Sequence, residues 1–67
     1  MVTIDKLDRE FASSTVYGVE ATVTGARNSA HALDMVLNEL SRTGWTVSIE
    51  RYEGRINEDG SHSISMF

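Results

Sequence analysis

Apolar residues repeat at helical spacing in the middle of the chain, over residues 29–43. Either Asn28 or Ser29 can cap the start of this helix, and Gly44 stands where a left-handed residue commonly follows a helix end. The repeat predicts one helix with a single apolar stripe that packs on other elements. The predicted stripe consists of Ala30, Leu33, Val36, Leu37 and Leu40.

Residues 15–25, TVYGVEATVTG, alternate with a period of two instead, which predicts a strand that ends at Gly25. The side chains expected to face the core are Tyr17, Val19, Ala21 and Val23. Those expected to be more exposed to water are Val16, Gly18, Glu20, Thr22 and Thr24.

Two further strands are predicted after the helix, in residues 44–53 and 61–67. The side chains expected on their core side are Trp45, Val47, Ile49, His62, Ile64 and Met66. The alternation fails beyond residue 51, and a bulge near Gly54 would restore it. Asp59 and Gly60 form a strong hairpin signal between the two strands.

The chain begins with residues 3–14, TIDKLDREFASS, in which Ile4, Leu7 and Phe11 are spaced like one stripe of a helix. With Thr3 as its cap, this pattern predicts a short helix of about two turns.

The predicted fold is therefore α+β, in one domain of residues 1–67. It consists of a three-stranded antiparallel sheet with one main helix on one face, preceded by a short N-terminal helix. The strand–helix–strand crossover should be right-handed, and the last strand should insert between the first two, in sheet order 1-3-2. Because one helix covers only one face, the other is left to solvent or to a partner.

A chain of 67 residues can bury only a small core, and such domains commonly need a supplement. The absence of cysteine excludes disulfides and thiolate metal sites, and it is typical of proteins in a reducing cytoplasm. The two histidines lie far apart in sequence, which argues against a structural zinc site. We expect no metal and no cofactor. Oligomerisation, for example as a homodimer, is the expected supplement.

The ten acidic and six basic residues give a net charge of -4. This balance disfavours direct binding to nucleic acid, and it suits either a soluble protein or one whose partner has a basic surface. No apolar run approaches the ~20 residues of a membrane span. The charged N-terminal stretch is unlike a secretory signal, so we expect a cytoplasmic protein.

Acidic residues gather in the predicted final hairpin, where negative groups could imitate nucleic acid or pair with the arginines of a partner. The predicted partner-binding residues are Glu50, Arg51, Tyr52, Glu53, Glu58 and Asp59. In the alternative interpretation, these charges only keep an edge strand from aggregating.

Four other patterns resemble functional sites, but ordinary structure explains them better. Residues 25–29 can bind an anion at a helix N-terminus, yet they also read as a loop and cap. His31 and Asp34 lie three apart on the helix without a nucleophile nearby, and residues 57–60 lack the later ligands of a calcium loop. Trp45 is either a core residue or a stacking platform. We do not expect an enzyme.

The succession VYGVEATVTG, HALDMVL and GWTVSIERYEGRINEDG resembles the dodecins, small flavin-binding proteins that assemble into dodecamers. This resemblance implies a flavin stacked on Trp45. The glutamine-containing motif with which that family contacts flavin has no equivalent in SHSISMF.

The acidic, cysteine-free chain with one helix and a small sheet also resembles phage-encoded inhibitors, including host RNA polymerase inhibitors and some anti-CRISPR proteins. This resemblance implies a protein that masks a basic surface of a nucleic-acid-handling complex in a bacterial host. A dodecin-like oligomer and a structural homodimer are the alternatives.

Overall fold

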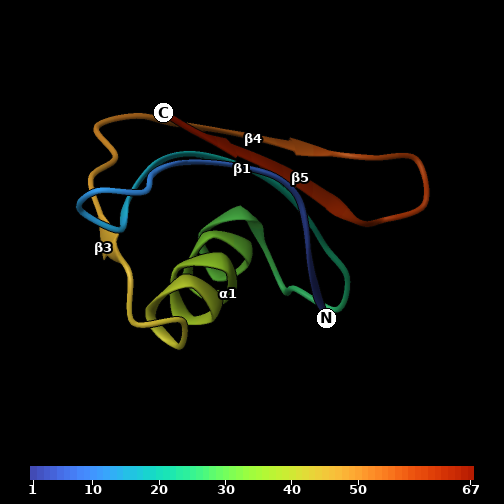
Figure 1. Cartoon of the computed structure of the whole chain (residues 1–67). Helices are drawn as coiled ribbons and strands as arrows, with labels where there is room; N and C mark the ends of the chain where they lie inside the picture. Colours follow the sequence, from blue (N-terminus) through green and yellow to red (C-terminus); the bar gives the residue numbers. More distant parts are fainter.

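Five strands and one helix make up the structure, a computed structural model that describes residues 1–67. The elements are β1 (Val2–Glu10), β2 (Thr15–Val23), α1 (Ser29–Ser41), β3 (Thr46–Val47), β4 (Tyr52–Ile56) and β5 (His62–Met66). Four strands form an antiparallel sheet in the order β1-β2-β5-β4, and the short β3 pairs with β2 in parallel. The sheet arches over α1 (Figure 1), so it has an inner face toward the helix and an outer face away from it.

The predicted three-stranded sheet with a short N-terminal helix is wrong, because the chain begins with a nine-residue strand, β1. Its register with β2 passes from Ile4 opposite Ala21 to Lys6 opposite Glu20, which leaves Asp5 as an extra residue. Such a bulge shifts the alternation by one position. Leu7 therefore lies on the inner face only three residues after Ile4, a spacing that imitates a helix.

A second bulge lies across the same pair of strands and changes which residues of β2 are buried. The register passes from Asp8 opposite Gly18 to Arg9 opposite Val16, so Tyr17 is the extra residue. Val16 is fully buried and Tyr17 is 54% exposed, the reverse of the prediction. Beyond the bulge, the three remaining predicted core residues are buried as expected: Val19, Ala21 and Val23.

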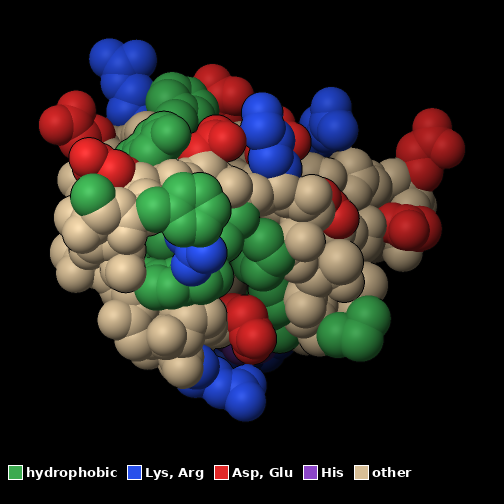
Figure 2. Space-filling model, viewed as in Figure 1, with side chains coloured by type: hydrophobic (Ala, Val, Ile, Leu, Met, Phe, Trp, Pro, Cys, Tyr) green, Lys and Arg blue, Asp and Glu red, His purple; other side chains and the backbone are tan.

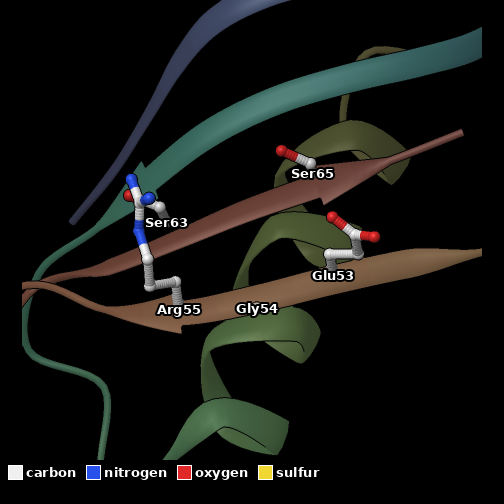
Figure 3. A pocket seen from close by; sticks show the side chains of 5 residues that line it. All are labelled: Glu53, Gly54, Arg55, Ser63 and Ser65. Carbon is white, nitrogen blue, oxygen red and sulfur yellow. The ribbon is translucent and has the colours of Figure 1, made fainter.

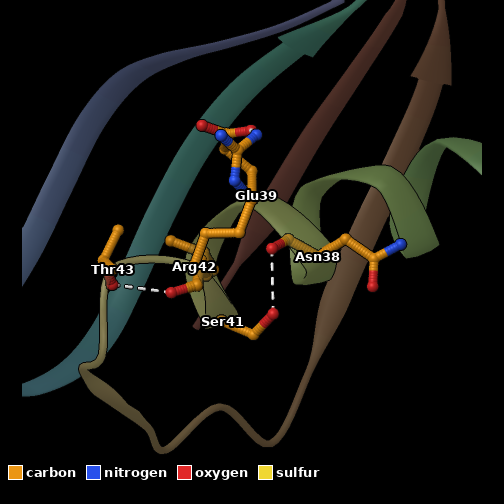
Figure 4. Close-up of polar contacts among 6 residues, drawn as sticks. Asn38, Glu39, Ser41, Arg42 and Thr43 are labelled. Carbon is orange, nitrogen blue, oxygen red and sulfur yellow. Dashed lines mark hydrogen bonds and ion pairs between the residues drawn. The ribbon is translucent and has the colours of Figure 1, made fainter.

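The helix α1 forms where the sequence predicts it. The Asn28 side chain accepts a hydrogen bond of 2.8 Å from the His31 amide, which identifies Asn28 as the cap. At the other end the Ser41 hydroxyl donates to the Asn38 carbonyl at 2.9 Å, and the Thr43 hydroxyl donates to a carbonyl of the last turn (Figure 4). Gly44 follows with the positive φ of 79° that favours glycine.

The buried stripe of α1 is rotated from the prediction and consists of Ala32, Val36 and Leu40. Leu37 is 39% exposed, Leu33 is partly buried and Ala30 is exposed. The small Ala32 side chain is fully buried in the core. The two displaced leucines instead line a groove toward β4, together with Tyr52 and Met66.

After the helix, the predicted strand over residues 44–53 is divided in two. Thr46–Val47 form β3, which pairs with β2, and Tyr52 and Glu53 belong to β4, which pairs with β5. The alternation predicted for the first part is nevertheless confirmed, because Trp45, Val47 and Ile49 pack against the core. No bulge occurs near Gly54, since the register of β4 with β5 is regular. The core side of β5 is as predicted, with His62, Ile64 and Met66 buried.

The core has nine buried apolar members, contributed by β2, α1 and β5: Val16, Val19, Ala21, Val23, Ala32, Val36, Leu40, Ile64 and Met66. The helix α1 is not long and apolar enough to span a membrane.

Candidate functional site

The outer face of the sheet carries two rows of polar side chains that run across the strands. In one row, Glu20 of β2 and Glu53 of β4 flank Ser65 of β5. Directly opposed residues share a face in antiparallel pairs, so all three side chains lie together on the outer face. The side chains of Glu53, Arg55, Ser63 and Ser65 project from one side of the sheet in Figure 3.

A second row lies one step along the strands, with Ser63 between Thr22 and Arg55. The Thr22 hydroxyl donates a hydrogen bond of 2.8 Å to the Asp5 carboxylate, which the β1 bulge brings to this face. The two rows therefore combine carboxylates, hydroxyls and one guanidinium without any apolar side chain between them.

The short serine side chains leave the outer face hollowed. A depression of about 550 Å³ lies between Glu53, Arg55, Ser63 and Ser65. A neighbouring depression of about 240 Å³ extends it toward β1 and β2, with Asp5, Glu20 and Thr22 among its lining residues. Both depressions are open to solvent, as expected for a contact surface rather than a sheltered reaction site.

Carboxylates on this face form no ion pair within 4.0 Å, although Lys6 of β1 lies directly opposite Glu20 and shares its face. The molecule has one ion pair, between Arg42 and Glu39 at 3.4 Å on α1, so nine of its ten acidic side chains form none within 4.0 Å. We call the carboxylates of Asp5, Glu20 and Glu53 the acidic outer face.

All six predicted partner-binding residues are exposed, but they do not form one surface. Glu50 and Arg51 precede β4, and residues 58–59 lie in the turn at its opposite end. On β4 itself, Tyr52 lies on the inner face because it opposes buried Met66, and only Glu53 joins the outer face. In Figure 2, acidic side chains stand at the end of the molecule over the β4–β5 turn, apart from those along the outer face.

Asp59 has a structural partner within its own turn. Its carboxylate accepts hydrogen bonds from the Ser61 hydroxyl at 2.6 Å and from the Ser61 amide at 2.9 Å. These two bonds stabilise the ionised form and hold the pKa of Asp59 below its ordinary value. This carboxylate therefore stabilises the turn between β4 and β5.

Sequence reasoning missed two acids of the outer face, Asp5 and Glu20, as part of the site. The alternation of residues 15–25 does place Glu20 away from the core. Its proximity to Glu53 depends on β5 lying between β2 and β4, and the position of Asp5 depends on the bulge. The bulge has no local signal in the sequence, and the insertion of the last strand is expected only from the rules of strand connection.

Trp45 packs against the core and has a cationic partner as well. The Arg9 guanidinium lies 4.6 Å from the centroid of the Trp45 ring. The Arg9 guanidinium thus covers one face of the indole ring, where a flat ligand would otherwise stack.

The other candidate patterns have local structural roles. The His31 Nδ1 atom accepts a hydrogen bond of 3.0 Å from the Arg27 amide, in the loop that leads into α1. No hydrogen bond joins His31 to Asp34, and no group of three or more potential ligands is placed to hold a metal ion. His62 is 4% exposed, and its Nδ1 atom has no hydrogen-bond partner.

No protein-family model, curated protein or solved structure matches this chain.

Proposed function

We propose that this protein is a non-catalytic binding module that attaches to a basic surface of another protein through its acidic outer face. In the form that the sequence favours, the partner is a nucleic-acid-handling complex in the cytoplasm of a bacterial host. The module would then be an inhibitor, which covers the surface that phosphates otherwise occupy. The observation that carries the proposal is the uncovered outer face, whose carboxylates lack internal ion pairs.

The chemistry of the face suits long basic side chains. Arginine and lysine of a partner can reach into the hollow over Ser63 and Ser65 and pair with Glu20 or Glu53. The serine hydroxyls supply further acceptors at the base of the hollow. Complementary charge of this kind raises the association rate and makes binding sensitive to salt.

Charge reversal on opposite sides of the molecule tests this proposal. Glu20→Lys places a cation in the acidic outer face. Asp34→Lys makes the same change of charge on the exposed surface of α1, beneath the other face of the sheet. Wild type and both variants, shown to be folded by circular dichroism, are immobilised and exposed to a bacterial lysate. Bound proteins are identified by mass spectrometry and eluted with duplex DNA or with salt.

The expected result is a basic nucleic-acid-binding protein that wild type and D34K retain and E20K loses. Duplex DNA should elute it, because the nucleic acid and the module compete for one surface. Retention of the same proteins by E20K, or a partner that DNA does not displace, would contradict the proposed mode of binding.

A further inference from the structure

The two edges of the sheet differ in how well they are protected against further strand pairing. The β1 edge is distorted by the bulge at Asp5 and carries Lys6, both features that keep edge strands from pairing. The β4 edge is regular, and all five of its residues are exposed. The chain contains no proline that could block it.

Alternate backbone groups of β4 point to solvent. Arg51 and Phe67 exchange both backbone hydrogen bonds, at 2.8 and 2.9 Å, and the Asn57 amide donates to the Ser61 carbonyl at 2.8 Å. In an antiparallel pair only every second residue bonds to its neighbour. The N–H and C=O groups of Tyr52, Gly54 and Ile56 therefore face the free edge.

From these features we infer that a second copy of this chain pairs with β4, strand against strand, across a twofold axis at Gly54. The sequence of β4, YEGRI, is complementary to itself when one copy runs antiparallel to the other. With Gly54 opposite Gly54, Tyr52 of each copy opposes Ile56 of the other, and Glu53 opposes Arg55. Opposite charges and aromatic–β-branched pairs are the combinations that stabilise neighbouring strands.

The hydrogen-bonding pattern fits this register without adjustment. The outward-facing residues oppose one another, Tyr52 with Ile56 and Gly54 with Gly54, so each such pair can exchange two backbone hydrogen bonds. Glu53 and Arg55 fall at the intervening positions, where opposed side chains lie closest. Neither has an ion pair within its own chain, so the second copy supplies the missing partner.

The inner face supplies apolar contacts to the same seam. Tyr52 is 55% exposed and Ile56 is 65% exposed, beside a groove of about 180 Å³ that Leu33 and Leu37 line from α1. A twofold axis normal to the sheet keeps inner faces on one side, so the Tyr52 and Ile56 side chains of both copies cover each other there. With only 12 of 67 residues buried within one chain, this burial adds to a small core.

The seam leaves the acidic outer face largely in place. Asp5 and Glu20 of both copies would lie on the same side of a continuous sheet, and Glu53 would be engaged with Arg55 of the second copy. The dimer does not depend on the proposed function, since E20K tests partner binding and changes no residue of the seam.

The molecular mass in solution tests the dimer, together with charge variants that should weaken the association and then restore it. Wild type should change from one chain of 7.4 kDa to two as its concentration rises from ~1 µM to ~1 mM. Glu53→Arg and Arg55→Glu each place like charges opposite one another twice, which should weaken dimerisation by roughly tenfold or more. The double variant E53R/R55E should recover the wild-type association. An equimolar mixture of E53R with R55E should form mixed dimers, because each then offers the charge that the other lacks.

A cysteine at the axis gives an independent readout. A Cβ atom at Gly54 would meet Ile64 Cδ1 at 3.5 Å, an ordinary contact, so Gly54→Cys is tolerated within one chain. Opposed residues of a hydrogen-bonded pair have Cα atoms about 5.5 Å apart, within disulfide range. G54C should therefore oxidise to a covalent dimer much faster than the control Glu58→Cys in the exposed turn.

Three results would overturn the inference. They are a wild-type mass of one chain throughout the concentration range, a dimer that E53R and R55E leave unchanged, and cross-linking of G54C no faster than that of E58C.

Discussion

The Arg9 guanidinium lies over two aromatic rings, 4.6 Å from the centroid of Trp45 and 4.6 Å from that of Phe11. It connects the end of β1 with the residue that precedes β3. The Thr46 amide donates to the Ser14 carbonyl at 3.2 Å in the same region. This cluster joins the β1–β2 turn to the segment that follows the helix.

Replacing Arg9 with glutamine should lower the free energy of unfolding by about 0.5–1 kcal/mol, the range of a partly exposed cation–π contact. The emission of Trp45, the single tryptophan, should also change because its charged neighbour is lost. Urea denaturation followed by fluorescence measures both. Arg27→Gln removes an exposed arginine elsewhere and should leave both unchanged; an equal effect of R27Q would show that net charge is responsible.

Truncation of helix leucines distinguishes the observed stripe from the predicted one. Leu40 is 1% exposed, so Leu40→Ala should destabilise the fold by about 2–5 kcal/mol, the range for buried leucine. Leu37→Ala should cost clearly less under conditions in which the protein is monomeric, because that side chain is 39% exposed. Chemical denaturation at low protein concentration compares the free energies of unfolding of the two variants. Equal losses would show that Leu37 is buried as the sequence predicts.

The turn at Asp59 should make stability depend on acid pH. Because its folded pKa lies below the unfolded value, its hydrogen bonds stabilise the fold above the unfolded pKa, and this contribution is lost as pH falls through the folded pKa. The free energy of unfolding should therefore fall below about pH 4 more steeply in wild type than in Asp59→Asn. The asparagine keeps an acceptor for Ser61 but does not titrate. Parallel pH profiles of the two proteins would exclude Asp59 as a source of the dependence.

The two histidines should respond in opposite directions to the same replacement. His62 buries an Nδ1 atom without a partner, so His62→Leu should raise the free energy of unfolding by about 1 kcal/mol as that unsatisfied group is removed. His31→Leu removes the acceptor of the Arg27 amide and should lower it by about 0.5–1.5 kcal/mol. Thermal denaturation at neutral pH measures both changes. A destabilised H62L would indicate that the His62 Nδ1 atom has a hydrogen-bond partner in solution.

The sequence predicts the structure well where the strands and the helix are regular, and it fails where a bulge interrupts a strand. The alternation of residues 61–67 correctly placed Ile64 on the inner face, and α1 has the predicted extent to within two residues at its end. In β1, the extra residue Asp5 separates Ile4 from Leu7 by three positions, and this spacing imitates one face of a helix. A bulge depends on pairing with a distant strand, so the local pattern cannot reveal it.

The candidate site shows the same limit. The sequence names both Glu53 and Asp59 as partner-binding residues, and the structure places Glu53 on the outer face and Asp59 in the β4–β5 turn, where it accepts hydrogen bonds from Ser61. Glu20 lies 33 residues before Glu53 in the chain, and the insertion of β5 between their strands brings the two carboxylates onto one surface. The sequence predicts that insertion, but the registers that set Glu20 and Glu53 beside Ser65 have no local signal.

That insertion also constrains how the chain can fold. β5 is the last strand in the sequence yet occupies an inner position, with Val23 of β2 opposite His62. The β1–β2 ribbon can form from local contacts, but its apolar side stays uncovered until a loop of nearly forty residues closes. A chain still lacking Ile64 and Met66 has no complete core, so the apolar side of the ribbon stays exposed to aggregation until β5 has paired.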